Sequence, residues 1–158
     1  MCIESMVEEI DIQGGKLTYG QRIELGRILG DEKMHSSRRF RAAIACLYPD
    51  AMPEYDAEWL TVYEHILEGV KYWMEAERTM LHYDPTPEEV AAGCEQLGAK
   101  IGPMMTVMTL AEKFGQDPDT ILGWEYGKVF GLLYANLERS KFDARYQKIC
   151  AKKSRRAR

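Results

Sequence analysis

The longest uninterrupted helical pattern in the sequence runs from about Asp56 to His82 and constrains the fold more than any other feature. Large apolar side chains recur along it every three or four residues and form one stripe, while charged residues fill most of the other side. At about 1.5 Å per residue, such a helix is some 40 Å long and can serve as the central helix of a domain. The stripe consists of Trp59, Leu60, Tyr63, Ile66, Leu67, Val70, Trp73, Met74, Met80 and Leu81.

Start and stop signals divide the rest of the chain into further helices. A capping box, in which a threonine oxygen accepts a backbone N–H and a side chain three residues later reaches back, is predicted at Thr18-x-x-Gln21 and at Thr86-Pro87-x-Glu89. Glycine or proline ends most of the apolar runs. The first two of these predicted helices cover 18–30 and a segment that is capped by Ser36 or Ser37 and closed by Pro49. The next two cover 86–101 and 104–114, with a break between them at Gly102-Pro103. A short helix then starts at Asp117-Pro118, and a last one runs from about Trp124 toward Ile149.

The segment from Ile3 to Ile12 is compatible with a short N-terminal β-strand that ends at the Gly14-Gly15 turn. Such a strand either pairs with a short neighbour or leaves an open edge to which another chain can add. The predicted fold class is therefore mainly α, with about six or seven helices in a single compact domain. We expect this domain over residues 1–150 and a flexible basic C-terminal tail over 151–158.

Composition favours a folded protein outside membranes and secretory compartments. Of the 158 residues, 46% are hydrophobic and 29% charged, which excludes a disordered chain. No apolar stretch approaches the roughly 20 residues that span a bilayer, and the first residues lack the pattern of a secretion signal. A cytoplasmic location is therefore expected, and no membrane partner.

Charge is distributed unevenly along the chain. The segment from Arg139 to Arg158 holds nine basic residues and one acid, so it carries +8. Because the whole chain carries −4, the remaining 138 residues carry −12. A basic tail of this kind either meets an acidic partner or nucleic acid, or is a solvated terminus.

Residues that carry catalysis or bind metals do not occur at the required spacings. A di-iron site needs two Glu-x-x-His pairs, and only Glu32-x-x-His35 is present. His65 and His82 lie 17 residues apart, and the cysteines form no C-x-x-C pair, so they are expected to be reduced thiols. Gly14-Gly15 lacks the rest of a phosphate-binding motif. We expect no enzyme, no cofactor and no metal site.

Two pairs of glycines spaced by four residues, Gly98 with Gly102 and Gly127 with Gly131, lie within the predicted helices. Glycine inside a helix costs about 1 kcal/mol relative to alanine, so another interaction should offset it. We interpret Gly127 and Gly131 as sites of close helix packing within the chain, with a partner interface as the alternative. Gly98 and Gly102 are predicted to mark a helix end.

Two segments carry a family resemblance. In the first, an aromatic-glycine helix end at Phe114-Gly115 precedes the Asp117-Pro118 helix start, the pair Ile121-Leu122 and an aromatic-rich helix from Trp124 to Tyr134. This segment, 110–134, resembles the tail assembly chaperones of long-tailed bacteriophages and prophages, as does the opening helix over 17–29. The two segments cover about a quarter of the chain, and their motifs describe packing rather than catalysis.

The resemblance implies a non-enzymatic chaperone that holds a long helical tape-measure protein while tail-tube subunits assemble around it in the bacterial host cell. It also implies a longer product made by frameshifting near the end of the gene, and Lys152-Lys153 is compatible with an A-rich slippery run. The clustered methionines are either adaptable binding surface or core fillers. The tentative partner-binding residues are Met104, Met105, Met108, Trp124, Lys152, Lys153, Arg155 and Arg156.

Two further hypotheses belong to other classes of function. A small nucleic-acid-associated regulatory protein would use Arg38, Arg39 and Arg41 together with the basic C-terminal tail, although the acidic body opposes phosphate binding. A helical enzyme would require a deep pocket that gathers carboxylates or His65.

Overall fold

The computed structural model describes residues 11–51 and 57–156, with side chains up to Lys153. Seven α-helices make up most of this part of the chain, and no β-strand is present in it. The prediction of a mainly α fold is confirmed. The helices are α2 (Tyr19–Gly30), α3 (Ser36–Leu47), α4 (Ala57–Met80), α5 (Pro87–Ala91), α6 (Cys94–Phe114), α7 (Pro118–Leu122) and α8 (Tyr126–Arg156).

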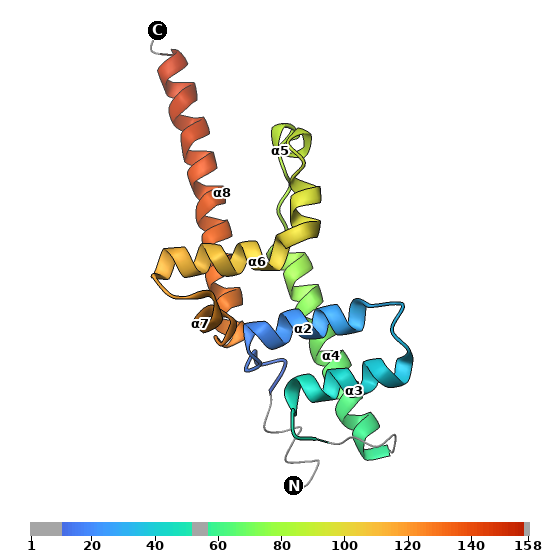
Figure 1. Ribbon diagram of the computed structural model, residues 1–158. Helices are drawn as coiled ribbons and strands as arrows, with labels where there is room; N and C mark the ends of the chain where they lie inside the picture. The colour runs from blue at the N-terminus through green and yellow to red at the C-terminus, as the bar shows by residue number, and fades with distance from the viewer. Residues whose placement is uncertain (1–10, 52–56, 157–158) are drawn as a thin grey trace.

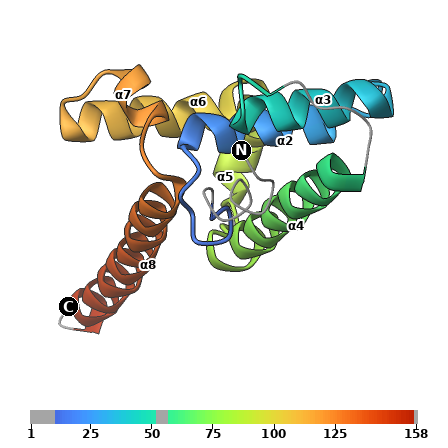
Figure 2. The same cartoon turned by 90° about the horizontal axis from the view of Figure 1, so that it is seen from below.

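The helices form two layers, which Figures 1 and 2 show from two directions. Helices α2, α3 and the second half of α6 form one layer and cross the long helices α4 and α8 in the other. Contacts join α2 to α3, α4, α7 and α8, so α2 lies at the centre of the arrangement. The end of α4, with α5 and the first half of α6, projects from one side of this body, and so does the far half of α8.

The core lies where the two layers meet. The predicted long helix is confirmed as α4, and Val62, Ile66, Val70 and Trp73 form its buried face. Leu67, Met74 and Met80 from the predicted stripe are exposed instead, because the body covers a narrower face of α4 than the apolar pattern indicated. Other core residues are Phe40, Ile44 and Leu47 from α3, Val107 and Leu110 from α6, and Val129 and Phe130 from α8.

The N-terminal segment from Ile12 to Tyr19 joins α4 to the start of α8. The Trp73 indole Nε1 donates a 2.6 Å hydrogen bond to the Ile12 carbonyl. Further along, the Tyr126 and Gly127 backbone N–H groups donate to the Leu17 and Gly15 carbonyls at 2.8 and 3.0 Å. The predicted strand is not found at Ile12, because this residue begins a turn whose carbonyl accepts from Gly15. Residues 3–10 of that prediction lie outside the described residues.

Local capping signals place several helix boundaries as predicted. Both arms of the Thr18–Gln21 box are formed, at 3.1 and 2.9 Å, and the Thr86–Glu89 box is formed as well. The cap predicted at Ser36 or Ser37 is wrong, since His35 occupies it. Its Nδ1 accepts from the Ser37 backbone N–H at 3.3 Å, so an imidazole replaces the expected hydroxyl.

The break predicted at Gly102-Pro103 is a kink within α6. Ile101 has a non-helical backbone (φ −137°, ψ 15°), and the axis of α6 turns sharply there (Figure 1). Proline lacks the N–H that would continue the helical hydrogen bonds, which accounts for the bend beside Pro103. The expectation that Gly98 marks a helix end is wrong, because Gly98 lies within the first half of α6.

The two glycines predicted to pack closely in α8 behave differently. A side chain on Gly127 would meet the backbone of Gly14 and Gly15 at 3.4 Å, which confirms close packing. Gly131 has no neighbour within 4 Å of the place where its side chain would begin, so the same prediction is wrong there. Helix α8 then continues to Arg156, and the expected tail boundary at residue 150 does not coincide with a helix end.

Gly15 offers a test of this packing. It has a positive φ of 77°, and an added Cβ would lie only 2.6 Å from the Gly127 Cα. We expect Gly15→Ala to lower the free energy of unfolding by about 3 kcal/mol, because left-handed strain adds to overpacking. Gly131→Ala is the matched control and should raise it by about 0.5 kcal/mol. Urea unfolding measures both, and a Gly15→Ala protein as stable as wild type would contradict the packing.

Candidate protein-binding surface

The second half of α6 exposes a row of methionines. Its opposite side packs into the core through Val107 and Leu110. Met104, Met105 and Met108 are 45, 42 and 56% exposed, so they do not fill the core. A long flexible thioether in water leaves apolar surface uncovered, and methionine surfaces of this kind adapt to differently shaped partners.

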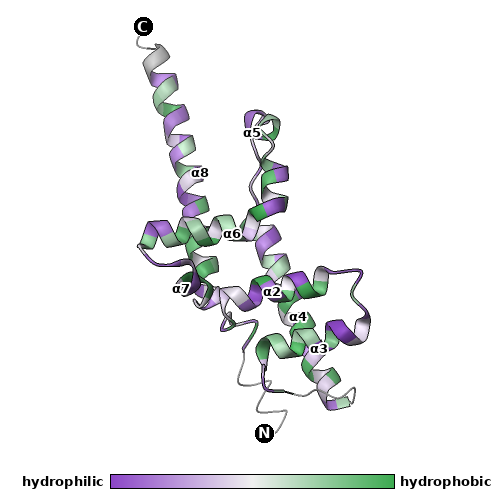
Figure 3. Ribbon diagram, in the orientation of Figure 1, coloured by the Kyte–Doolittle hydropathy of each residue, from purple (hydrophilic) through white to green (hydrophobic). Residues whose placement is uncertain are grey.

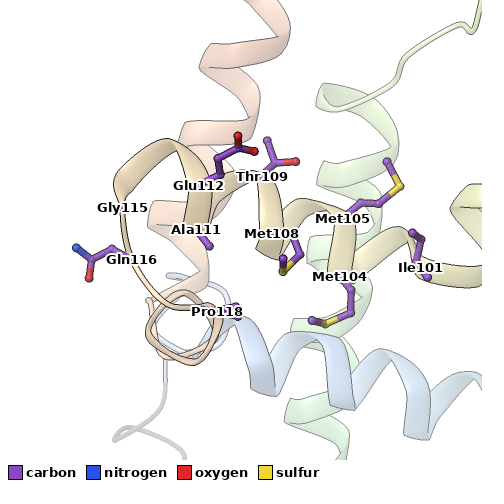
Figure 4. Close-up of a pocket in the computed structure, with 10 residues that line it drawn as sticks. All are labelled: Ile101, Met104, Met105, Met108, Thr109, Ala111, Glu112, Gly115, Gln116 and Pro118. Atoms are coloured by element: carbon purple, nitrogen blue, oxygen red, sulfur yellow. The ribbon is translucent and has the colours of Figure 1, made fainter.

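The methionines line an open hollow of about 800 Å³ between α6 and the start of α7. Figure 4 shows Met104 and Met108 directed to the side of α6 on which Pro118 lies, with Thr109 and Glu112 on the other side. Most of the lining is therefore apolar, with polar groups at its margin. The residues around the hollow are Ile101, Met104, Met105, Met108, Thr109, Ala111, Glu112, Gly115, Gln116 and Pro118.

The remaining predicted partner-binding residues are not gathered at this hollow. Trp124 is partly buried and packs edge-on against Phe114 with ring centroids 5.4 Å apart, and the Lys128 ammonium lies 4.1 Å from its ring centroid. Lys152 and Lys153 are exposed near the far end of α8. The side chains of Arg155 and Arg156 lie outside the described residues.

A partly buried polar cluster that sequence reasoning missed joins three helices. Arg22 of α2, which is only 8% exposed, donates from Nε and from one Nη to the two carboxylate oxygens of Glu77 in α4, at 3.1 and 2.9 Å. The Tyr126 hydroxyl of α8 donates to the same carboxylate at 2.5 Å. The cluster borders a second hollow of about 700 Å³ beneath the kink of α6.

This cluster is a structural clamp. Burial raises the pKa of the Tyr126 phenol above its usual range, and the Glu77 carboxylate raises it further, so both effects favour the protonated hydroxyl that donates in the cluster. The Arg22–Glu77 ion pair balances the charges within the cluster, and the Tyr126 hydroxyl adds a hydrogen bond to the same carboxylate. One signal was available in the sequence: Arg22 lies between Tyr19 and Leu25 at helical spacing, on the face that is buried.

The histidines and the other candidate ligands lie apart. His35 caps α3, and His82 pairs with Asp84 at 2.9 Å on the surface. His65 lies in α4 with its Nε2 buried and without a hydrogen-bond partner. Among the described residues, no three His, Cys, Asp or Glu side chains are grouped closely enough to hold a metal ion. None of the described helices combines the length and apolar character needed to cross a bilayer.

The two basic segments do not form one surface. Helix α3 and the far end of α8 lie at opposite ends of the molecule in both views (Figures 1 and 2). Within α3, Arg38 and Arg41 are exposed, whereas Arg39 donates to the carbonyls of Asp31 and Met34 at 2.5 and 3.2 Å. Arg39 therefore holds the α2–α3 connection in place.

Comparison with known proteins gives no further guide to the site. No protein-family model, curated protein or solved structure matches the chain. The exposed methionines, the buried clamp and the distribution of charge are therefore the observations from which function is inferred.

The clamp predicts a difference between two glutamates of α4. Glu77→Gln should lower the free energy of unfolding by about 2 kcal/mol, because it leaves the buried Arg22 guanidinium without an opposite charge. Glu75→Gln is the matched control, since Glu75 pairs with Arg78 on the surface and should leave stability unchanged. Both are measured by urea unfolding. Equal stability of the two variants would show that the clamp contributes nothing.

Proposed function

We propose that this chain is a non-enzymatic tail assembly chaperone of a phage or prophage, which binds a long helical tape-measure protein in the bacterial cytoplasm. The resemblance of 17–29 and 110–134 to such chaperones is the starting point. These two segments pack against each other. The Tyr19 N–H donates to the Trp124 carbonyl, and the Tyr126 N–H donates to the Leu17 carbonyl, both at 2.8 Å. The resemblance thus involves one contiguous part of the molecule.

The exposed methionine row carries the proposal. A tape-measure helix presents apolar side chains every three or four residues, and an apolar hollow on a rigid helix can receive such a ridge. Met104 and Met108 are four residues apart, so they lie next to each other on α6 and present a continuous apolar strip. Flexible methionines suit a client whose sequence varies along its length.

Binding to the tape-measure protein encoded in the same genome tests the proposal. Purified chain and synthetic helical peptides that tile this protein would be compared by biolayer interferometry. We expect Met108→Lys to weaken binding about tenfold, which corresponds to about 1.4 kcal/mol, because a charge would enter an apolar contact. Met74→Lys is the matched control, because Met74 is 58% exposed on α4 and lies outside the hollow, whereas Met108 is 56% exposed.

Two results would contradict this function. One is the absence of binding to every peptide of the tape-measure protein at micromolar concentration. The other is a gene located in a metabolic operon rather than between genes for a major tail protein and a tape-measure protein. Equal weakening by Met74→Lys and Met108→Lys would leave the function standing but would move the binding surface away from the hollow.

A further inference from the structure

The far half of α8 projects from the body without covering any of it. Every residue from Arg139 to Lys153 is exposed, and both views show this part of the helix apart from the other elements (Figures 1 and 2). At about 1.5 Å per residue, the 18 residues from Arg139 to Arg156 extend some 27 Å. A helical segment of this length is only marginally stable in water without a surface to pack on.

One face of this segment is apolar. Phe142, Tyr146 and Ile149 are 58, 59 and 54% exposed and are spaced by four and then three residues, as in the seam of a coiled coil. The Phe142 and Tyr146 rings stack on each other, with centroids 6.2 Å apart. Hydrophilic residues alternate with this stripe along the helix (Figure 3). The segment 139–156 holds eight basic residues and Asp143, so it carries +7.

The other projecting part of the molecule carries the opposite charge and also exposes apolar side chains. We call residues 80–101, which include the end of α4, α5 and the first half of α6, the acidic arm. Four acids and Lys100 give it a charge of −3, with His82 neutral. Tyr83, Val90 and Leu97 are 54, 50 and 47% exposed on it. Its four acids are Asp84, Glu88, Glu89 and Glu95.

We propose that the chain forms a two-fold symmetric dimer in which α8 of each copy packs on the acidic arm of the other. Both parts project from the same side of the body (Figure 1), so two copies facing each other can exchange them. Pairing of α8 with α8 is disfavoured, because it would bring two segments of +7 together. In the exchanged arrangement, opposite charges flank two apolar strips.

Two-fold symmetry lowers the area that each contact has to bury. A stable interface buries about 1,600 Å² in total. Two-fold symmetry makes the α8–arm contact occur twice, so each occurrence needs to bury only about 800 Å². Apart from Ile101, at the end of the arm, the residues that line the methionine hollow lie outside the acidic arm, so dimer formation and client binding can fail independently.

Complementary charge reversals test this arrangement. Four substitutions on α8 change its charge from +7 to −1: Arg145→Glu, Lys148→Glu, Lys152→Glu and Lys153→Glu. On the arm, Glu88→Lys with Glu95→Lys changes the charge from −3 to +1. All six side chains are exposed, and none of them belongs to an ion pair among the described residues. By light scattering after size exclusion, the wild type should have twice the 18.2 kDa monomer mass, and each variant alone should be a monomer.

Mixing the two variants should restore the dimer, because one exchanged contact then pairs −1 on α8 with +1 on the arm and the other pairs +7 with −3. Circular dichroism at wild-type strength would show that each variant remains helical. The Debye length is about 14 Å at 0.05 M salt and about 4 Å at 0.5 M, so added salt screens the attraction between α8 and the arm. The dimer fraction should therefore decrease when the salt concentration is raised from about 0.05 to about 0.5 M.

Several outcomes would overturn the proposal. A wild type that is monomeric in 0.05 M salt would do so. The same holds if the monomer co-purifies with nucleic acid, because the basic segment of α8 would then bind phosphates instead of a second copy. An arm-reversed variant that still dimerises alone would also overturn it, since the arm would then lie outside the interface. A mixture that stays monomeric while both variants are folded would exclude the exchange of α8 between copies.

Discussion

Arg22, Glu77 and Tyr126 come from α2, α4 and α8, and their ion pair and hydrogen bonds join the three helices at one partly buried point. Charged groups are costly to bury, so each member depends on the other two. The N-terminal segment passes beside this point and hydrogen-bonds to Trp73 and to the start of α8. The two long helices are thus fixed relative to each other here, and they diverge beyond it.

The features that sequence reasoning predicted well depend on neighbouring residues. A capping box requires only Thr18 and Gln21, and the kink of α6 follows from Pro103, so both can be recognised from a few letters. Features that depend on distant residues were missed or misassigned. Arg22 and Glu77 are 55 residues apart, and nothing near Gly131 distinguishes it from Gly127, which meets Gly15 across the fold.

The candidate surface was predicted only in part for the same reason. Apolar spacing indicates which side of a helix is suited to burial, but it does not reveal whether another element covers that side. Met74 and Met108 fit helical stripes as well as core residues do, and both are exposed. Trp124, chosen with the methionines, packs against Phe114 at the corner of α6, α7 and α8. Knowledge of the neighbours was therefore needed to separate binding surface from core.

The kink at Ile101 assigns the two halves of α6 to different surfaces. The first half belongs to the acidic arm, and the second half carries the methionine hollow. A straight helix would align these two apolar regions along one axis, and a single partner would cover both. With the bend, the proposed dimer surface and the proposed client surface are separate, so a dimer would carry two client sites. Capture of one stretch of a repetitive client would then raise the effective concentration of the next, and avidity would replace tight binding at either site alone.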